Sequence, residues 1–396
     1  MDGARSGTAA RVTWMRSRMP ELLVLLIAAT LRAVFVHQYD YTWGYDFPDH
    51  RVYIDWFQDH LRLPPPLPDL MISKEAYHPP LFYLLAASLL RMGGSYDGLQ
   101  RLMALMGLMR LALIWYGLER YVPSRAARIL GLILAAILPA AVHLDGMVYG
   151  ESLNALLAVV SLLLLMRFLE MSDGRWKVGA LLGVALGLGV LTKLSGLILL
   201  AVAGAGIAID LSWWTGPARD RLRRLAPASA VLVALLAVAG PHHVASYRAR
   251  HKVFLTGWDG PDGHQLRSSQ IEKTPYLDRR TLGYFAGWSN DIFQSPYWPS
   301  GTLPHPRFWP VLVASTFVDY YNYRFGYRPD PGEPTIKLNE MPLALSVLEA
   351  SRASVAGGMM IVATTVLAWS GLARWVWRRR RAELAAALLL PALAVA

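Results

Sequence analysis

Long runs of apolar residues, separated by short basic stretches, constrain this chain more than any other feature of its sequence. A helix needs about 17–25 predominantly apolar residues to cross the hydrocarbon core of a bilayer. In a bilayer only helices and closed barrels satisfy their backbone groups, and these runs lack the alternation of a barrel strand. The sequence therefore predicts an all-α polytopic membrane protein with about nine transmembrane helices, including a partial span from Leu384 to Ala396. The predicted spans are 20–37, 100–118, 126–142, 152–169, 177–192, 194–210, 225–241 and 353–373.

Composition supports this class and excludes others. The chain is 54% hydrophobic and only 17% charged, whereas a soluble protein of this length carries more charge. It contains no cysteine, so disulfides and thiolate metal sites are excluded. The net charge of +11 does not indicate nucleic acid, because the basic residues lie between the apolar runs. The first run, Met19 to His37, is long enough to span and lacks the cleavage site of a secretory signal.

The basic clusters predict the orientation, because cytoplasmic loops of membrane proteins are enriched in Lys and Arg. All clusters fall on one side only if the apolar stretch Leu81–Leu90 does not cross the membrane. That stretch has about ten residues and follows two prolines, so we expect an interfacial or re-entrant helix. The clusters are Arg5–Arg18, Arg120–Arg128, Arg167–Lys177, Arg219–Arg224 and Arg378–Arg381.

This orientation predicts how the chain is divided between the membrane and its two sides. The short turn His143–Glu151 is expected on the outer face, and Phe308–Phe325 is expected to form a helix along the membrane surface. The predicted parts are a cytoplasmic N-terminus (1–19), a transmembrane catalytic core (20–240) with an external first loop (38–99), an external aromatic-rich segment (241–352), and C-terminal transmembrane helices (353–396).

The first external loop is unusually rich in acidic, His and Pro residues between Gly44 and Tyr83. Asp46 and Asp49 lie shortly after the first predicted span, among Tyr and Trp residues. A carboxylate that is partly desolvated by aromatic neighbours becomes more basic and is a candidate general base. The alternative is that both are ordinary solvated loop residues.

Two further charged residues are expected at helix ends on the same face. Glu151 begins a predicted helix, where an acid either complements the helix dipole or serves as a second carboxylate of a site. Lys193 lies between two apolar runs, where it either extends toward the headgroups or binds a lipid phosphate.

Several histidines and arginines are weaker candidates. His78, in His78-Pro79-Pro80, is a candidate substrate or metal contact beside a rigid turn. Arg248 and Arg250 lie among His242, His243 and His251, and this group predicts a basic outer surface facing anionic lipid rather than a metal site.

The glycines at 179, 183 and 187 have a spacing of four, which indicates close helix packing. The sequence contains no phosphate-binding glycine loop and no dinucleotide fingerprint. A transferase with this sequence is therefore not expected to use a cytoplasmic nucleotide sugar as its donor.

Four motifs, in order, resemble the bacterial C-type glycosyltransferases related to protein O-mannosyltransferases and aminoarabinose transferases. The motifs together span most of the chain from about residue 20 to residue 325. They are Asp46-x-x-x-His50-x-x-Tyr53-Ile54 with Leu63-Pro64 and Tyr77-His78-Pro79-Pro80-Leu81-x-Tyr83; Tyr149-Gly150-Glu151-Ser152-Leu153 after Pro139; Gly187 to Gly196 around Lys193; and Phe308-Trp309 through Asp319-Tyr320-Tyr321.

The resemblance implies an outer cavity that binds a polyprenyl-phosphate-linked sugar, in a bacterial inner membrane with the site facing the periplasm. It implies Asp46 as the catalytic base. Many relatives carry Asp-Glu where this chain has Asp46-Phe47, so Asp49 is an alternative second acid. The acceptor, whether glycan, lipid or protein, is not specified.

These observations predict an inverting transfer by single displacement at the anomeric carbon. Asp46 would deprotonate or orient the acceptor hydroxyl, and Glu151 would order the loop or hold a sugar hydroxyl. His50, Tyr53 and His78 are expected to contact substrate, and Lys193 with Arg248 or Arg250 to bind the leaving phosphate. No cofactor is required by the sequence, although a divalent metal in part of the cationic role is left open. The alternative function is a polytopic lipid or solute transporter or flippase, for which broken helices and inverted repeats would be expected.

Overall fold

A computed structural model describes residues 3–43, 47–62, 76–171, 174–212, 218–255 and 282–287, and every regular element among them is a helix. This confirms the predicted all-α class for the described part of the chain. The helices are α1 (Gly3–Gln38), the 3₁₀ turn η1 (Tyr41–Trp43), α2 (Phe47–His60), α3 (Leu81–Arg91), α4 (Tyr96–Tyr121), α5 (Arg125–Ile137), α6 (Pro139–Asp145), α7 (Glu151–Glu170), α8 (Arg175–Thr192), α9 (Gly196–Ser212), α10 (Ala218–Arg250) and α12 (Leu282–Ala286).

Five helical segments of the described residues are long and apolar enough to cross a membrane. They coincide with predicted spans, so the integral membrane class is confirmed. The predicted spans at 353–373 and 384–396 and the surface helix Phe308–Phe325 lie outside the described residues, and the total of about nine helices stays a prediction. The segments are Arg18–Gln38, Tyr96–Tyr121, Glu151–Glu170, Arg175–Thr192 and Leu225–Arg248.

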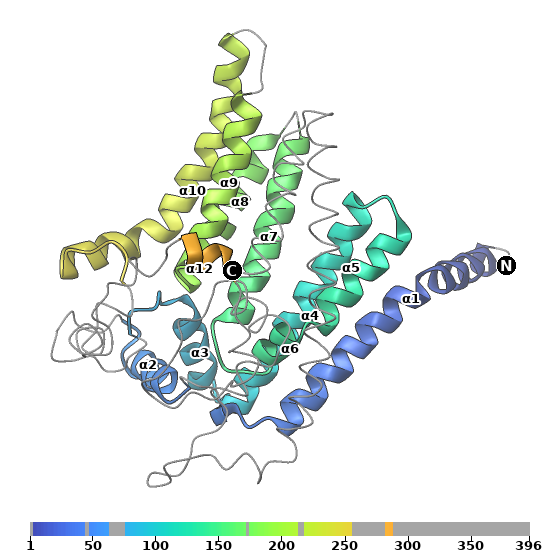
Figure 1. Cartoon of the computed structure of the whole chain (residues 1–396), viewed down its shortest axis with the longest axis horizontal. Coiled ribbons are helices and arrows are strands. Elements are labelled where there is room, and N and C mark those ends of the chain that lie inside the picture. Colours follow the sequence, from blue (N-terminus) through green and yellow to red (C-terminus); the bar gives the residue numbers. More distant parts are fainter. Residues whose placement is uncertain are drawn as a thin grey trace.

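The long helices diverge from the end of the molecule that holds α2, α3 and α6 (Figure 1). Helix α4 packs against α1, α5 and α7, and α8 lies between α7 and α10. Short α3, with 11 residues, packs mainly against α2. Its length agrees with the expectation that this stretch does not cross the membrane.

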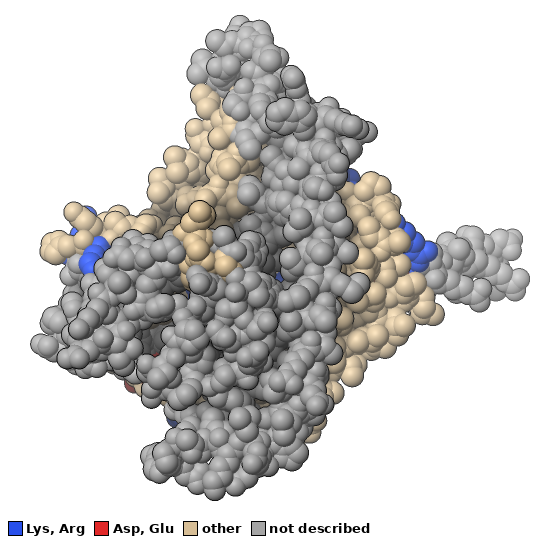
Figure 2. Space-filling model, in the orientation of Figure 1, with Lys and Arg blue, Asp and Glu red and all other residues tan. Residues whose placement is uncertain are grey.

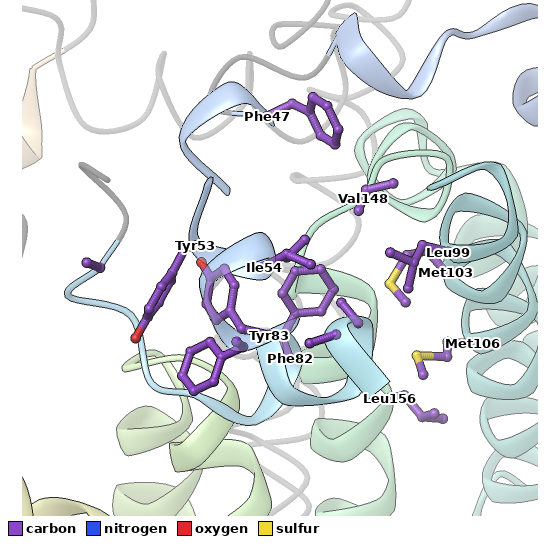
Figure 3. Packing of buried hydrophobic residues seen from close by; sticks show 14 residues of the cluster. Phe47, Tyr53, Ile54, Phe82, Tyr83, Leu99, Met103, Met106, Val148 and Leu156 are labelled. Atoms are coloured by element: carbon purple, nitrogen blue, oxygen red, sulfur yellow. The ribbon is translucent and has the colours of Figure 1, made fainter. Parts of the chain in front are cut away.

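A compact aromatic cluster joins α2 and α3 to α4 and the start of α7 (Figure 3). Phe47, Tyr53, Phe82 and Tyr83 are at most 2% exposed, and Met103 of α4 closes the other side. After α3 the chain reverses at Gly93, whose φ of +87° is accessible to glycine at little cost. Ser95 then caps α4 by accepting a hydrogen bond from the backbone N–H of Gly98. The first loop is thereby packed onto the helices instead of lying free.

The predicted span 126–142 forms two helices, α5 and α6, instead of one. The break falls at Leu138, and Pro139 occupies the first turn of α6. Proline has no N–H to donate and its ring collides with the preceding turn, so it begins a helix readily and interrupts one. The run remains apolar through Pro139, which is why hydropathy alone predicts a continuous span.

The basic clusters flanking α1, α4, α7 and α8 lie at one end of the molecule, which we call the basic end. Ion pairs connect the helices there. On the face shown in Figure 2, the described Lys and Arg side chains that can be seen lie mainly at the left and right margins. The pairs are Arg18–Glu119 (α1–α4), Arg125–Glu21 (α5–α1), Arg120–Glu170 (α4–α7) and Arg175–Asp210 (α8–α9).

Helices α8 and α10 approach each other along the predicted glycine face. A Cβ added at Gly179 would lie 2.7 Å from the carbonyl oxygen of Pro227, and one at Gly187 would lie 2.8 Å from Cβ of Val238. At Gly183 it would overlap the carbonyl oxygen of Val231. The prediction that these glycines serve helix packing is confirmed, and we call this contact the glycine seam.

Candidate functional site

A small pocket lies where α2, α3, the α6–α7 turn and the α8–α9 connection meet. It encloses about 210 Å³, including the part that opens to the surroundings. Most of its lining side chains are polar or ionisable, although the membrane core around it is apolar. The lining residues are His50, His78, Phe82, Tyr83, Gly150, Glu151, Thr192 and Lys193.

An ion pair between Glu151 and Lys193 forms one wall of the pocket. Glu151 is the first residue of α7, and Lys193 directly follows α8 in an extended conformation with φ of −157°. The ammonium Nζ of Lys193 donates to Oε1 of Glu151. The side chains are only 33% and 26% exposed, so each charge is partly removed from solvent and depends on the other.

A second polar contact lies one helical turn further along α7. Asn154 Nδ2 donates to Ser195 Oγ at 3.0 Å, again joining α7 to the α8–α9 connection. The connection itself is tight, because a Cβ at Gly196 would lie 2.6 Å from the carbonyl carbon of Gly189. These contacts hold Lys193 at the boundary between two helices, where a long cation can reach the pocket.

The opposite wall is built from the first loop and α3. His50 Nδ1 lies 2.7 Å from the hydroxyl of Tyr83, and its ring packs edge-on against Tyr149 with centroids 4.6 Å apart. The His50 and His78 rings are stacked with centroids 5.8 Å apart. Tyr53 donates from its hydroxyl to the backbone oxygen of His78 at 3.4 Å. Residues from α2 and from the segment before α3 thus converge on one place.

Four of the residues predicted from sequence are brought together in the pocket: His50, His78, Glu151 and Lys193. Tyr53 lies beneath them and is 1% exposed. The pocket also includes Phe82, Tyr83 and Thr192, which were not predicted as site residues, although Tyr83 ends the motif that begins at Tyr77 and Thr192 lies in the motif around Lys193.

The remaining predicted residues are not in the pocket wall. Asp49 lies in the first turn of α2 and is partly exposed. Asp46 immediately precedes α2 but lies outside the described residues. Arg248 is exposed near the end of α10, and the side chain of Arg250 also lies outside the described part.

Part of the chain matches a known protein family. Residues 77–243 match the family described as dolichyl-phosphate-mannose-protein mannosyltransferase. Over this part of its length, the chain is similar to the C-type glycosyltransferases. This confirms the resemblance drawn from the sequence motifs and indicates a membrane glycosyltransferase. No curated protein matches the chain.

The part that matches the glycosyltransferase family includes most of the pocket. His78, Tyr83, Glu151 and Lys193 fall inside the matched range, whereas His50 precedes it. Asp46 also precedes the match, so the role of the first loop rests on the sequence motifs alone. Among the described residues, no group of three or more His, Cys, Asp or Glu is arranged to hold a metal ion. The metal alternative stays a prediction.

A buried charge cluster beside the pocket was not predicted. Asp145, which is fully buried, accepts from Arg32 Nε at 2.8 Å and from Arg110 Nη2 at 2.9 Å. Its other oxygen accepts from Ser152 Oγ at 3.0 Å. The signal was present in the sequence, because Arg32 and Arg110 lie inside predicted spans and a charge there requires a partner.

Proposed function

We propose that this protein is an integral membrane glycosyltransferase that moves a sugar from a polyprenyl-phosphate-linked donor to an acceptor hydroxyl. The observation that carries the proposal is the pocket in which the Glu151–Lys193 pair faces His50 and His78. It lies at the end of the molecule opposite the basic end. Under the positive-inside rule that end faces outward, which for a bacterial inner membrane is the periplasm.

Lys193 is suited to bind the phosphate of the donor. Its ammonium pairs with Glu151 between the start of α7 and the end of α8, and it is partly shielded from water. A cation interacts more strongly with an anion in such a place than in bulk water. In this proposal the small pocket beside Lys193 receives the phosphate of the donor. In this proposal the polyprenyl chain lies outside it in the membrane. Arg248 and Arg250, at the end of α10, are candidates for additional positive charge.

Asp46 is proposed as the base. It precedes Phe47, which is 2% exposed within the aromatic cluster, and the proposal for Asp46 rests on the sequence motif. Asp49, in the first turn of α2, is the alternative base. Proton removal by a positioned side chain contributes about 10²–10⁴-fold to a rate.

The reaction is a single displacement with inversion. The acceptor oxygen forms a bond to the anomeric carbon while the bond to the donor phosphate oxygen breaks. The acceptor proton passes to Asp46, and the polyprenyl phosphate leaves with the bonding electron pair. Positive charge from Lys193 stabilises the negative charge that develops on the leaving phosphate.

One observation favours a transporter as the second candidate. The break between α5 and α6 gives a discontinuous helix, a feature of many secondary transporters. In such transporters, however, the site lies near the midplane at the broken helix. Here the pocket is lined by α2, α3 and the ends of α7 and α8.

The proposal is tested by transfer from a radiolabelled polyprenyl-phosphate sugar to extracted envelope lipids and glycans, using purified protein in detergent. We expect transfer by the wild type, near-complete loss in Asp46→Asn, and much smaller loss in the matched variant Asp49→Asn. Loss only in Asp49→Asn would move the base to that residue. Translocation of lipid without transfer from any donor would contradict the proposal and favour the transporter.

A further inference from the structure

The cluster of Arg32, Asp145 and Arg110 connects three parts of the chain that are far apart in sequence. Arg32 belongs to α1, Arg110 to α4, and Asp145 is the last residue of α6. Arg32 also donates from Nη1 to the backbone oxygens of Ala28 at 3.2 Å and Ala136 at 3.1 Å. The cluster thereby ties α1, α4 and α5 to the start of the α6–α7 turn.

Stability alone does not account for this arrangement. Two arginines around one carboxylate leave a net positive charge in a site where Arg32 is 1% and Asp145 0% exposed. Arg32 Nη2 is buried without a hydrogen-bond partner among the described residues. Buried ion pairs are often no more stabilising than apolar side chains of the same volume. A buried charge cluster at this depth, with a donor unpaired among the described residues, points to a role other than stability.

The turn that Asp145 begins is held closely on every side. Gln100 Nε2 donates to the backbone oxygens of Tyr39 and Gly146, each at 2.8 Å. A Cβ at Gly107 would overlap the Asp145 carboxylate, and one at Gly146 would overlap the ring of Phe35. The backbone of the turn is therefore in direct contact with α1 and α4.

The same turn delivers one wall of the pocket. Ser152, which donates to Asp145 Oδ1, is the residue after Glu151, and its hydroxyl also lies 3.1 Å from the backbone oxygen of Leu144. Tyr149 contacts His50, and Gly150 and Glu151 line the pocket opposite Thr192 and Lys193. A displacement of Asp145 would be transmitted through Ser152 to the first turn of α7.

We propose that Asp145, held between Arg32 and Arg110, is a positioning residue for the pocket, acting through Ser152 on the first turn of α7 so that Glu151 meets Lys193. It does not touch substrate. The inference rests on the proposed function for its kinetic consequence, whereas its geometric consequence is independent of that function.

The geometric test uses the absence of natural cysteines. A Cβ at Gly150 would lie 3.7 Å from Cγ2 of Thr192, so cysteines at these positions are within disulfide reach. In the variant Gly150→Cys/Thr192→Cys we expect rapid oxidation by copper phenanthroline, seen as a mobility shift that a reductant reverses. Adding Ser152→Ala, which removes the link to Asp145 but keeps both arginine pairs, should slow that oxidation.

The matched control is Ser161→Ala. Ser161 lies on the same helix and is similarly buried, but its hydroxyl has no hydrogen-bond partner among the described residues. It should leave the rate of disulfide formation unchanged. Both alanine variants should melt close to the wild-type temperature in detergent, which separates local placement from general loss of stability.

The kinetic test uses the natural cysteine-free chain. Because small misplacement of a reacting group is costly, Ser152→Ala should lower kcat for sugar transfer by about tenfold with little change in donor KM. Ser161→Ala should retain wild-type kinetics. If Ser152 served only the stability of the fold, Ser152→Ala would reduce the amount of folded protein, and kcat per folded molecule would stay at the wild-type value.

The outcomes distinguish this inference from the proposed function. Unchanged disulfide formation in Ser152→Ala would overturn the inference, whatever the transfer rate. Slower disulfide formation together with a wild type that transfers no sugar would support the placement by Asp145 and contradict the proposed function. Slower disulfide formation with a selective loss of kcat would support both.

Discussion

The two ends of the helix bundle use the same charged groups in different ways. At the basic end, the pairs Arg120–Glu170 and Arg175–Asp210 each join the ends of two helices, and Glu170 also pairs with Arg167 of its own helix. At the opposite end, two arginines share one carboxylate, and the turn they hold carries Glu151 to Lys193. The difference is one of place and burial: the basic-end pairs lie between helix ends, whereas the fully buried Asp145 joins α1 and α4 to the turn that leads to Glu151.

The largest difference is expected between two lysines at opposite ends of α8. Lys193→Met removes the cation from the pocket and should lower sugar transfer by about 10²–10³-fold, as loss of one preorganised charge-stabilising group does. Lys177→Met removes an exposed lysine at the basic end and should leave transfer unchanged. Initial rates with a labelled donor measure both. Equal loss in the two variants would remove the distinction between the ends.

The next effect compares the two ends of α7. Glu151→Gln keeps the shape of the side chain but releases Lys193, and should lower transfer by about 10–100-fold through loss of positioning. Glu170→Gln disrupts the pair with Arg120 at the basic end and should change the rate little. If Glu151→Gln were fully active, Lys193 would act without its partner and the pair would be only structural.

A smaller effect, on stability, is expected at the glycine seam. Gly183→Ala places a methyl group against the backbone of α10 and should destabilise the fold by about 1–3 kcal/mol, as overpacking does. Gly204→Ala on α9 meets nothing within 4 Å and should be neutral or slightly stabilising, because alanine favours a helix. Melting temperatures in detergent check both signs. A lower melting temperature for Gly204→Ala alone would contradict the close packing of α8 and α10.

The smallest effect is expected at the surface of the basic end. Arg120→Ala removes one of the two arginines that pair with Glu170, and exposed pairs contribute little because water screens them. Neither the melting temperature nor the transfer rate should change measurably. A clear loss of stability would show that the separate pairs at this end also depend on one another.

The sequence predicted much of this fold because hydropathy and helix length are local properties. The span predicted at 100–118 is the helix Tyr96–Tyr121, and the glycines at 179, 183 and 187 do pack against a neighbour. The division at Pro139 was missed because the run stays apolar on both sides of it. Glu151 and Lys193 were predicted separately as helix-end charges.

Contacts between distant residues could not be predicted in the same way. Glu151 and Lys193 are 42 positions apart, and Arg32 and Asp145 are 113 positions apart. No periodicity relates such residues, because their proximity follows from how the helices pack. Asp46 and the phosphate role of Lys193 remain predictions.

The glycine seam has a consequence for how a ligand reaches the pocket. With the backbones of α8 and α10 in contact, the two helices cannot separate or slide without breaking that contact. Thr192 and Lys193, at the end of α8, are therefore held in place by this packing. The facing wall comes from α2 and α3, which pack mainly against each other. Phe82 and Tyr83 on that wall also belong to the aromatic cluster that packs on α4 and α7. A headgroup larger than the pocket would therefore have to displace packed side chains of α3, because the α8 side is fixed by the glycine seam.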